Sequence, residues 1–202
     1  MVVDFSSADD ITVPNLDNGT TPSGTLAAMT SSDNITWSST FTPTFPNTQD
    51  WDNTLSLGTN YTDVENNPGT AATSPNYMVD DINPSVSSFG LSDTALKAGN
   101  NSVVTLVFSE AVASFSSDAD ITADNGTLAT MTSSDNITWT GTFTPTADTE
   151  DSSNTLTLAT SYTDPAGNAG PAATTANYAV DTLSPVVTNV ASTTGAGRYK
   201  EG

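Results

Sequence analysis

The chain has 202 residues, and its charge is strongly unbalanced, with 3 Lys and Arg against 23 Asp and Glu and a formal net charge of -20. Such a surface repels nucleic acid and anionic membranes, because it has almost no cations to replace the counterions of phosphates. It contains neither cysteine nor histidine, which excludes disulfides, zinc sites, thiol nucleophiles and imidazole bases. With no apolar run long enough to span a bilayer, we expect no nucleic-acid partner and no membrane insertion.

An internal repeat organises the sequence. The nine residues MTSSDNITW occur at Met29–Trp37 and again at Met131–Trp139. Further downstream, matched residues such as Asp63 and Asp164 lie 101 positions apart. Two copies of one module of about a hundred residues are the simplest explanation, and a repeat of this kind indicates tandem domains.

The two copies differ at their beginnings. Phe5 matches Phe115 at a larger offset, because the first copy carries an insertion of roughly residues 14–23. Val2 matches Val112, so nothing in the first copy corresponds to residues 85–110. We therefore expect residues 1–83 to form a truncated repeat that lacks the first two strands and is poorly stable alone. Residues 84–184 are expected to form a complete repeat, and residues 185–202 the start of a further one.

Alternating apolar and polar residues predict short strands with one buried face in the complete copy. In chain order the predicted strands are Val86–Leu91, Ser102–Phe108, a short strand around Ile121, Leu128–Met131, Ile137–Phe143, Thr155–Tyr162 and Ala176–Val180. No stretch has sustained helical periodicity. About seven strands separated by turn signals are typical of an immunoglobulin-like β-sandwich. The predicted fold class is all-β, with tandem Greek-key sandwiches and Trp139 as a core anchor.

The complete copy also resembles the bacterial Ig-like repeats found in the extender regions of large RTX-type surface adhesins. The resemblance rests on a set of motifs: VVTLVFSE at Val103–Glu110, NGTL at Asn125–Leu128, TDPAGN at Thr163–Asn168 and NYAVDT at Asn177–Thr182. It implies a secreted protein at the bacterial cell surface, with these modules as spacers that carry an adhesive domain elsewhere in the protein. The partners it implies are neighbouring repeats of the same chain, with a surface ligand bound through other domains. Several families of this kind stiffen their linkers with calcium.

Acidic residues are expected to converge where the first copy ends and the second begins. In an Ig-like topology, the end of the second strand, the loop after it and the last loop lie at the pole where the chain enters. The candidate ligands contributed by this pole and by the linker are Asp80, Asp81, Glu110, Asp118, Asp120, Asp164 and Asn168. Carboxylate and amide oxygens are what Ca²⁺ prefers, so we predict calcium at the junction between repeats. Asp181 would serve the next junction.

Simpler readings remain open. Asp and Asn are common turn residues, and each acid taken singly is expected to be solvated; Asp148, Glu150 and Asp151 are assigned to such a loop. A second functional hypothesis is a module that binds carbohydrate or protein, with Phe45, Trp51 and Tyr61 as candidates. A third is a glycosidase with paired carboxylates, which we do not expect, because small sandwiches with acids in loops form no cleft.

Overall fold

The computed structural model describes residues 11–12, 24–43, 49–191, 195, 197, 198, 200 and 202, and all structural statements concern these residues. Their contacts divide the chain into two compact units. One contains residues 1–84, 112–114 and 163–170, and the other residues 85–111, 115–162 and 171–202. The insertion at residues 14–23, the match of Phe5 and the aromatic candidate Phe45 lie outside the described residues. In the described part, no helix combines the length and the apolar character needed to cross a membrane.

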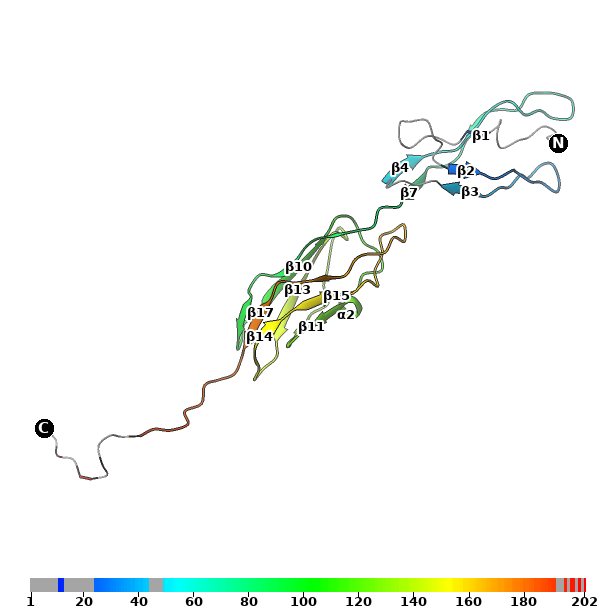
Figure 1. Cartoon of the computed structure of the whole chain (residues 1–202). Helices are drawn as coiled ribbons and strands as arrows, with labels where there is room; N and C mark the ends of the chain where they lie inside the picture. Colours follow the sequence, from blue (N-terminus) through cyan, green and yellow to red (C-terminus); the bar gives the residue numbers. More distant parts are fainter. Residues whose placement is uncertain are drawn as a thin grey trace. The chain divides into compact units, whose positions relative to one another are not determined.

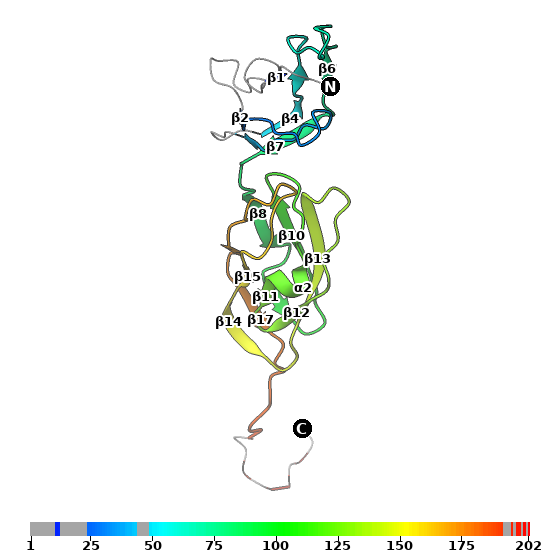
Figure 2. The ribbon, with the colours of Figure 1, turned by 90° about the vertical axis from the view of Figure 1, so that its right-hand side faces the viewer.

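The second repeat is built almost entirely from strands (Figure 1). Its elements are β8 (Val86–Leu91), β9 (Ala95–Lys97), β10 (Ser102–Phe108), α2 (Ser117–Asp120), β11 (Ile121–Ala123), β12 (Gly126–Leu128), β13 (Thr138–Pro145), β14 (Glu150–Asn154), β15 (Leu156–Leu158), β16 (Ala173–Thr174) and β17 (Tyr178–Asp181). One sheet has the order β12-β13-β10-β8, and two three-stranded sheets have the orders β11-β15-β16 and β14-β17-β9. All of these pairs are antiparallel except β17 with β9, which is parallel. Figure 2 shows the same elements from the side, with β13 and β14 at opposite edges of the view.

The core of the second repeat follows from the alternation of its strands. In β10, Val104, Leu106 and Phe108 are buried while Val103 is 50 % exposed. Rings of two sheets meet at this core, since the ring centroids of Phe143 in β13 and Tyr178 in β17 are 5.1 Å apart. Tyr162, in the segment after β15, also joins it, with its ring centroid 5.0 Å from that of Phe108. Edge-to-face and tilted contacts at such distances are favourable. Inward faces packed against each other make this repeat a β-sandwich.

Trp139 contributes to this core without anchoring it. Its side chain is half-buried, and its ring lies 4.8 Å from that of Phe115. The large side chains that are fully buried include Phe108, Phe143, Tyr162 and Tyr178. The aromatic anchors therefore come from several strands, whereas the sequence predicted a single tryptophan.

The strand predictions are correct in outline and wrong in several details. β8 and β10 have the predicted bounds. The strand predicted over residues 155–162 is shorter and runs from Leu156 to Leu158. The hydrogen bond from the Ala159 N–H to the Asp120 carbonyl at 2.8 Å extends its pairing with β11 by one more position. The acids at 150 and 151 were assigned to a loop, but they lie in β14, which pairs with β17. The single helical turn α2 was not predicted, because four residues are too few to show a period.

The first repeat has a matching but smaller set of strands. They are β1 (Ile11–Thr12), β2 (Gly24–Leu26), β3 (Phe41–Pro43), β4 (Gln49–Asn53), β5 (Ser56–Leu57), β6 (Ala72–Thr73) and β7 (Tyr77–Asp80). They pair as β1-β5-β6, β2-β3 and β4-β7. Each of these pairings has a counterpart in the second repeat, for example β4-β7 with β14-β17. In the described part of the first repeat, no strand corresponds to β8, β9 or β10.

Candidate metal centre

Asp80 lies at the end of the last strand of the first repeat. It is the final residue of β7 and is 9 % exposed. Its Oδ1 accepts a hydrogen bond from the Ile82 N–H at 3.0 Å, and its Oδ2 accepts one from Gln49 Nε2 at 3.0 Å. Both carboxylate oxygens are thereby held in fixed directions just before the chain enters the second repeat.

Asp164 organises the loop between β15 and β16. Its side chain is 1 % exposed. Oδ1 accepts hydrogen bonds from the N–H groups of Gly167 at 2.7 Å and Asn168 at 2.9 Å, and Oδ2 accepts one from Asn168 Nδ2 at 2.7 Å. Gly167 has a φ of 99°, in the left-handed region that favours glycine. The carboxylate of Asp164 therefore folds its own loop.

Asn168 ties this loop to Asp80. Besides its bond to Asp164, Asn168 Nδ2 donates to the Asp80 carbonyl oxygen at 3.1 Å. Asp80, Asp164 and Asn168 all belong to the same compact unit. One amide group thus holds together two of the acids that the sequence predicted as ligands.

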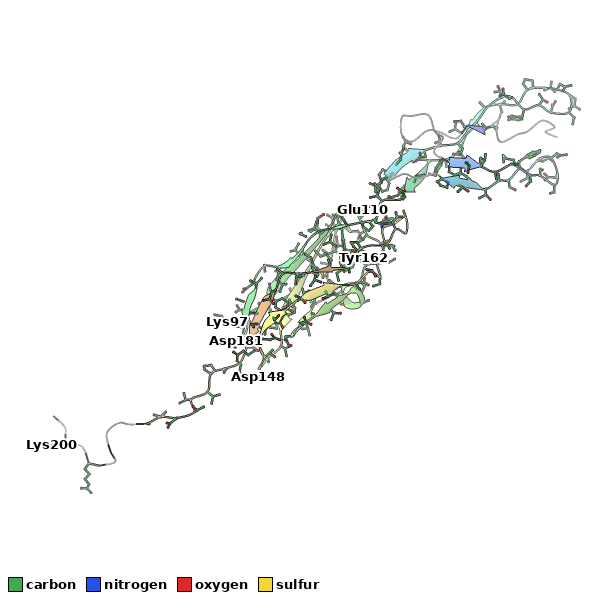
Figure 3. The ribbon with its side chains drawn as sticks, viewed as in Figure 1. Lys97, Glu110, Asp148, Tyr162, Asp181 and Lys200 are labelled. Atoms are coloured by element: carbon green, nitrogen blue, oxygen red, sulfur yellow. The ribbon has the colours of Figure 1, made fainter. Side chains whose placement is uncertain are left out.

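Glu110 completes an acidic triad. One carboxylate oxygen from each of Asp80, Glu110 and Asp164 lies within 4.8 Å of the others. Like charges this close repel one another strongly when partly removed from water. The nearest cation in the sequence, Lys97, lies at the opposite end of the second repeat from Glu110 (Figure 3). The triad can therefore bind a metal ion, because a cation would relieve this repulsion.

The other carboxylates predicted as ligands are not members of the triad. Asp118 is exposed and accepts hydrogen bonds from Thr130 Oγ1 at 2.9 and 3.1 Å. Asp120 is 4 % exposed and accepts hydrogen bonds from the Ser116 N–H at 2.7 Å and from Ser161 Oγ. These bonds hold the α2 turn in place. Asp81 is half-buried and is not a member of the triad.

Gln49 is a neighbour of the triad that sequence reasoning missed. It stands opposite Asp80 in the β4-β7 ladder and donates to its carboxylate. The corresponding pair in the second repeat is Glu150 opposite Asp181. The signal was present in the sequence, because Gln49 of the first copy stands where the second copy has Glu150.

The loop of the first repeat departs from the second in sequence but keeps most of its hydrogen bonds, including both bonds from the asparagine that ends the loop. Asp63 Oδ1 accepts hydrogen bonds from the N–H groups of Glu65 at 2.9 Å and Asn67 at 2.8 Å, and its Oδ2 accepts one from Asn67 Nδ2 at 2.9 Å. These hydrogen bonds, that from the Asn67 side chain first, lower the pKa of Asp63 below its ordinary value. Asn66, with a φ of 62°, takes the place of Gly167.

Of the aromatic candidates for a binding face, Trp51 and Tyr61 lie in the described residues and differ in exposure. Trp51 is 58 % exposed on β4. Tyr61 is half-buried, and its hydroxyl donates to the Thr70 carbonyl at 2.9 Å. Trp51 corresponds to Ser152, which is also exposed, so an exposed aromatic side chain at this position is particular to the first copy.

Comparison with known proteins agrees with this architecture. The family model described as bacterial Ig-like domain matches residues 2–79 and again residues 80–180. Neither a curated protein nor a solved structure matches the chain. Domains of this family are generally non-catalytic modules, and repeats of them are typical of surface proteins. The chain therefore belongs to the bacterial Ig-like domain family and contains two copies of the domain in tandem.

Proposed function

We propose that this chain is a spacer segment of a secreted bacterial surface adhesin, and that Ca²⁺ bound by Asp80, Glu110 and Asp164 stiffens the link between its repeats. Membership of a family typical of surface proteins supports the spacer role. Stacked modules of this kind form extended arrays in which each repeat meets its neighbours. The observation that carries the calcium part is the acidic triad, whose oxygens lie within 4.8 Å of one another.

The spacing of the triad suits calcium. Ca²⁺ binds oxygens at about 2.3–2.6 Å, so two of its ligands can be at most ~5 Å apart. Mg²⁺ demands near-octahedral geometry at about 2.0–2.1 Å and usually keeps several of its waters, binding through one or two carboxylates, so a set of three protein carboxylates favours Ca²⁺. Ca²⁺ takes six to eight oxygens, and water or further carbonyl oxygens complete the shell beyond these three carboxylates.

The position of Asp80 gives the ion a mechanical role. Asp80 ends β7 of the first repeat, while Glu110 follows β10 and Asp164 lies in the β15–β16 loop of the second repeat. An ion shared by these side chains restrains residues 81–83, which connect the two repeats. Binding to the native state alone stabilises it by mass action, by about 2.7 kcal/mol when the ion is at a hundred times its Kd.

The test is a thermal melt of the full chain in chelator and in millimolar calcium, with Glu110→Gln and Asp164→Asn beside the wild type. We expect calcium to raise the Tm of the wild type and to have little effect on either variant. Without calcium, Glu110→Gln should melt higher than the wild type, because it removes repulsion within the triad. Asp148→Asn is the matched control, since Asp148 is an exposed acid at the opposite end of the second repeat (Figure 3).

Two results would overturn the calcium part of the proposal. One is an unchanged wild-type Tm together with no bound metal at millimolar calcium. The other is an equal calcium response in the wild type and Glu110→Gln. Either result leaves a spacer that works without a metal ion.

A further inference from the structure

The turn between β11 and β12 contains an asparagine followed by an obligatory glycine. Asn125 has a φ of 48°, which asparagine tolerates better than most residues. A Cβ on Gly126 would lie 2.1 Å from Phe143 Cζ and 2.7 Å from the Thr144 carbonyl oxygen. The fold therefore requires glycine at this position, and the sequence supplies Asn–Gly.

Asn–Gly is chemically labile because no side chain on the glycine hinders the reaction of its backbone nitrogen. The nitrogen of Gly126 can attack Cγ of Asn125, giving up its proton as the new N–Cγ bond forms. The Cγ–Nδ2 bond then breaks and ammonia leaves, which yields a cyclic imide. Water opens the imide to aspartate or isoaspartate, so the net reaction consumes one water and releases one ammonia.

In the folded repeat the amide of Asn125 acts as a structural clamp. Its Nδ2 donates to Asp151 Oδ2 at 2.9 Å and to Asn154 Oδ1 at 2.6 Å. Asn154 is 1 % exposed and donates in turn to the carbonyl groups of Asp151 and Tyr178. The atom that must leave as ammonia is therefore held by two acceptors, one of them on a buried side chain.

Loss of this amide would reverse the local interaction. A carboxylate at position 125 has no hydrogen to donate, and it would face the carboxylate of Asp151 at hydrogen-bond distance. Removing the donor from the buried acceptor Asn154 costs about 1–3 kcal/mol, and the like charge of Asp151 adds to this. The folded state therefore opposes the reaction, both by holding the leaving group and by destabilising the product.

We propose that Asn125–Gly126 is a deamidation site that the folded second repeat keeps unreactive and that reacts when β14 detaches from the β11–β12 turn. A repeat that reacts while open cannot restore its clamp on closing. Transient opening is thereby converted into permanent loss of stability.

The chain contains its own reference site. The tetrapeptide Asp124-Asn125-Gly126-Thr127 also occurs as Asp17-Asn18-Gly19-Thr20. Since the nearest neighbours are identical, the two asparagines should deamidate at the same rate in urea. The first repeat lacks the labile pair at the corresponding turn, because Ser23 precedes Gly24.

The experiment follows deamidation of the full chain at mildly alkaline pH, in buffer and in urea, by peptic peptide mapping at acid pH. A synthetic peptide spanning residues 123–128 gives the unprotected rate in the same buffer. We expect Asn125 of the folded chain to react at least about tenfold more slowly than the peptide, which corresponds to an opening free energy of about 1.4 kcal/mol or more. Equal rates in the folded chain and the peptide would overturn the proposal.

A second measurement tests the clamp itself. Asn125→Asp copies the product and should lower the Tm of the second repeat. Adding Asp151→Asn should recover part of the loss, because the amide then donates from the other side of the same contact. An Asn125→Asp variant that melts like the wild type, or a double variant that melts below the single one, would contradict the clamp.

Discussion

One buried asparagine in each repeat fixes the local backbone through the same pair of hydrogen bonds. Asn154 Nδ2 donates to the carbonyl groups of Asp151 and Tyr178, and Asn53 Nδ2 donates likewise to Asp50 and Tyr77. Both asparagines are almost fully buried. A buried side-chain amide must find hydrogen-bond partners, and both of these amides do. This explains why Asn-Thr-Leu occurs in both copies, a match that hydrophobic patterning cannot account for.

Two buried tyrosines make the second repeat sensitive to alkali. Burial, with the charge of Asp120 as a smaller cause, raises the pKa of Tyr162 from 10.0 to about 12, and burial likewise raises that of Tyr178 to about 12. A raised pKa favours the neutral phenol in the folded state. Its stabilising effect is complete below pH 10 and is lost as pH rises to 12. One pKa unit is worth about 1.4 kcal/mol, so each phenol lowers the free energy of unfolding by on the order of 2 kcal/mol between pH 10 and pH 12.

Urea unfolding between pH 9 and pH 12 measures this loss. Tyr162→Phe serves as the control, because it removes one titrating group and one hydrogen bond, from the hydroxyl to the Pro171 carbonyl at 2.8 Å. The variant should be less stable at neutral pH but should lose less stability on going to high pH. A parallel pH dependence for both proteins would show that Tyr162 does not contribute.

At the scale of elements, a glycine lies under an aromatic ring at the same position of the same strand pair in each repeat. Gly126 opens β12 and lies under Phe143 of β13, while Gly24 opens β2 and lies under Phe41 of β3. The ring occupies the space that a Cβ would need. Each hairpin register is thus fixed by packing as well as by its ladder.

Gly126→Ala should therefore destabilise the second repeat by about 1–3 kcal/mol or more, as overpacking does. Gly90→Ala is the matched control, because a Cβ there would have nothing within 4 Å. Thermal melts of the two variants give the comparison. Similar Tm values for both would mean that the ring of Phe143 moves aside without cost.

At the scale of the whole molecule, the buried core is unevenly distributed between the repeats. Among the described residues, Val79 is the buried hydrophobic side chain of the first repeat, and all others lie between Leu96 and Val180. Phe41 and Tyr77 are half-buried, whereas their counterparts Phe143 and Tyr178 are fully buried. Burial of apolar area is the main source of stability, so the described part of the first repeat draws much less stability from it than the second repeat does.

Hydrogen exchange should show this difference directly. Backbone amides of β3 and β7 are expected to exchange faster than those of β10 and β13, because local opening costs less where fewer apolar contacts are lost. Mass spectrometry of peptides from each strand in one sample makes the comparison. Equal protection in β7 and β10 would contradict it.

The sequence predicts the strands that carry an apolar pattern, but not those placed by their pairing partners or the contacts set by side-chain directions. β10 was predicted because Val104, Leu106 and Phe108 alternate with the residues between them. β14 was missed because EDSSN carries no apolar signal, and its place in the sheet is set by pairing with β17. In the acidic cluster, topology was enough to bring Asp80, Glu110 and Asp164 to one pole. It could not show that Ser116 and Ser161 bind Asp120, since such bonds depend on side-chain directions.

The hydrogen bonds that Asp63 and Asp164 each accept from an asparagine four residues on have a consequence for how such a gene can change. Asp63 and Asp164, Asn67 and Asn168, and Asp80 and Asp181 are each separated by one period of 101 residues. Recombination between two copies that gains or loses whole periods therefore keeps each loop in step with the strand end that precedes it. The length of the protein can vary between generations while every connection inside it keeps its chemistry.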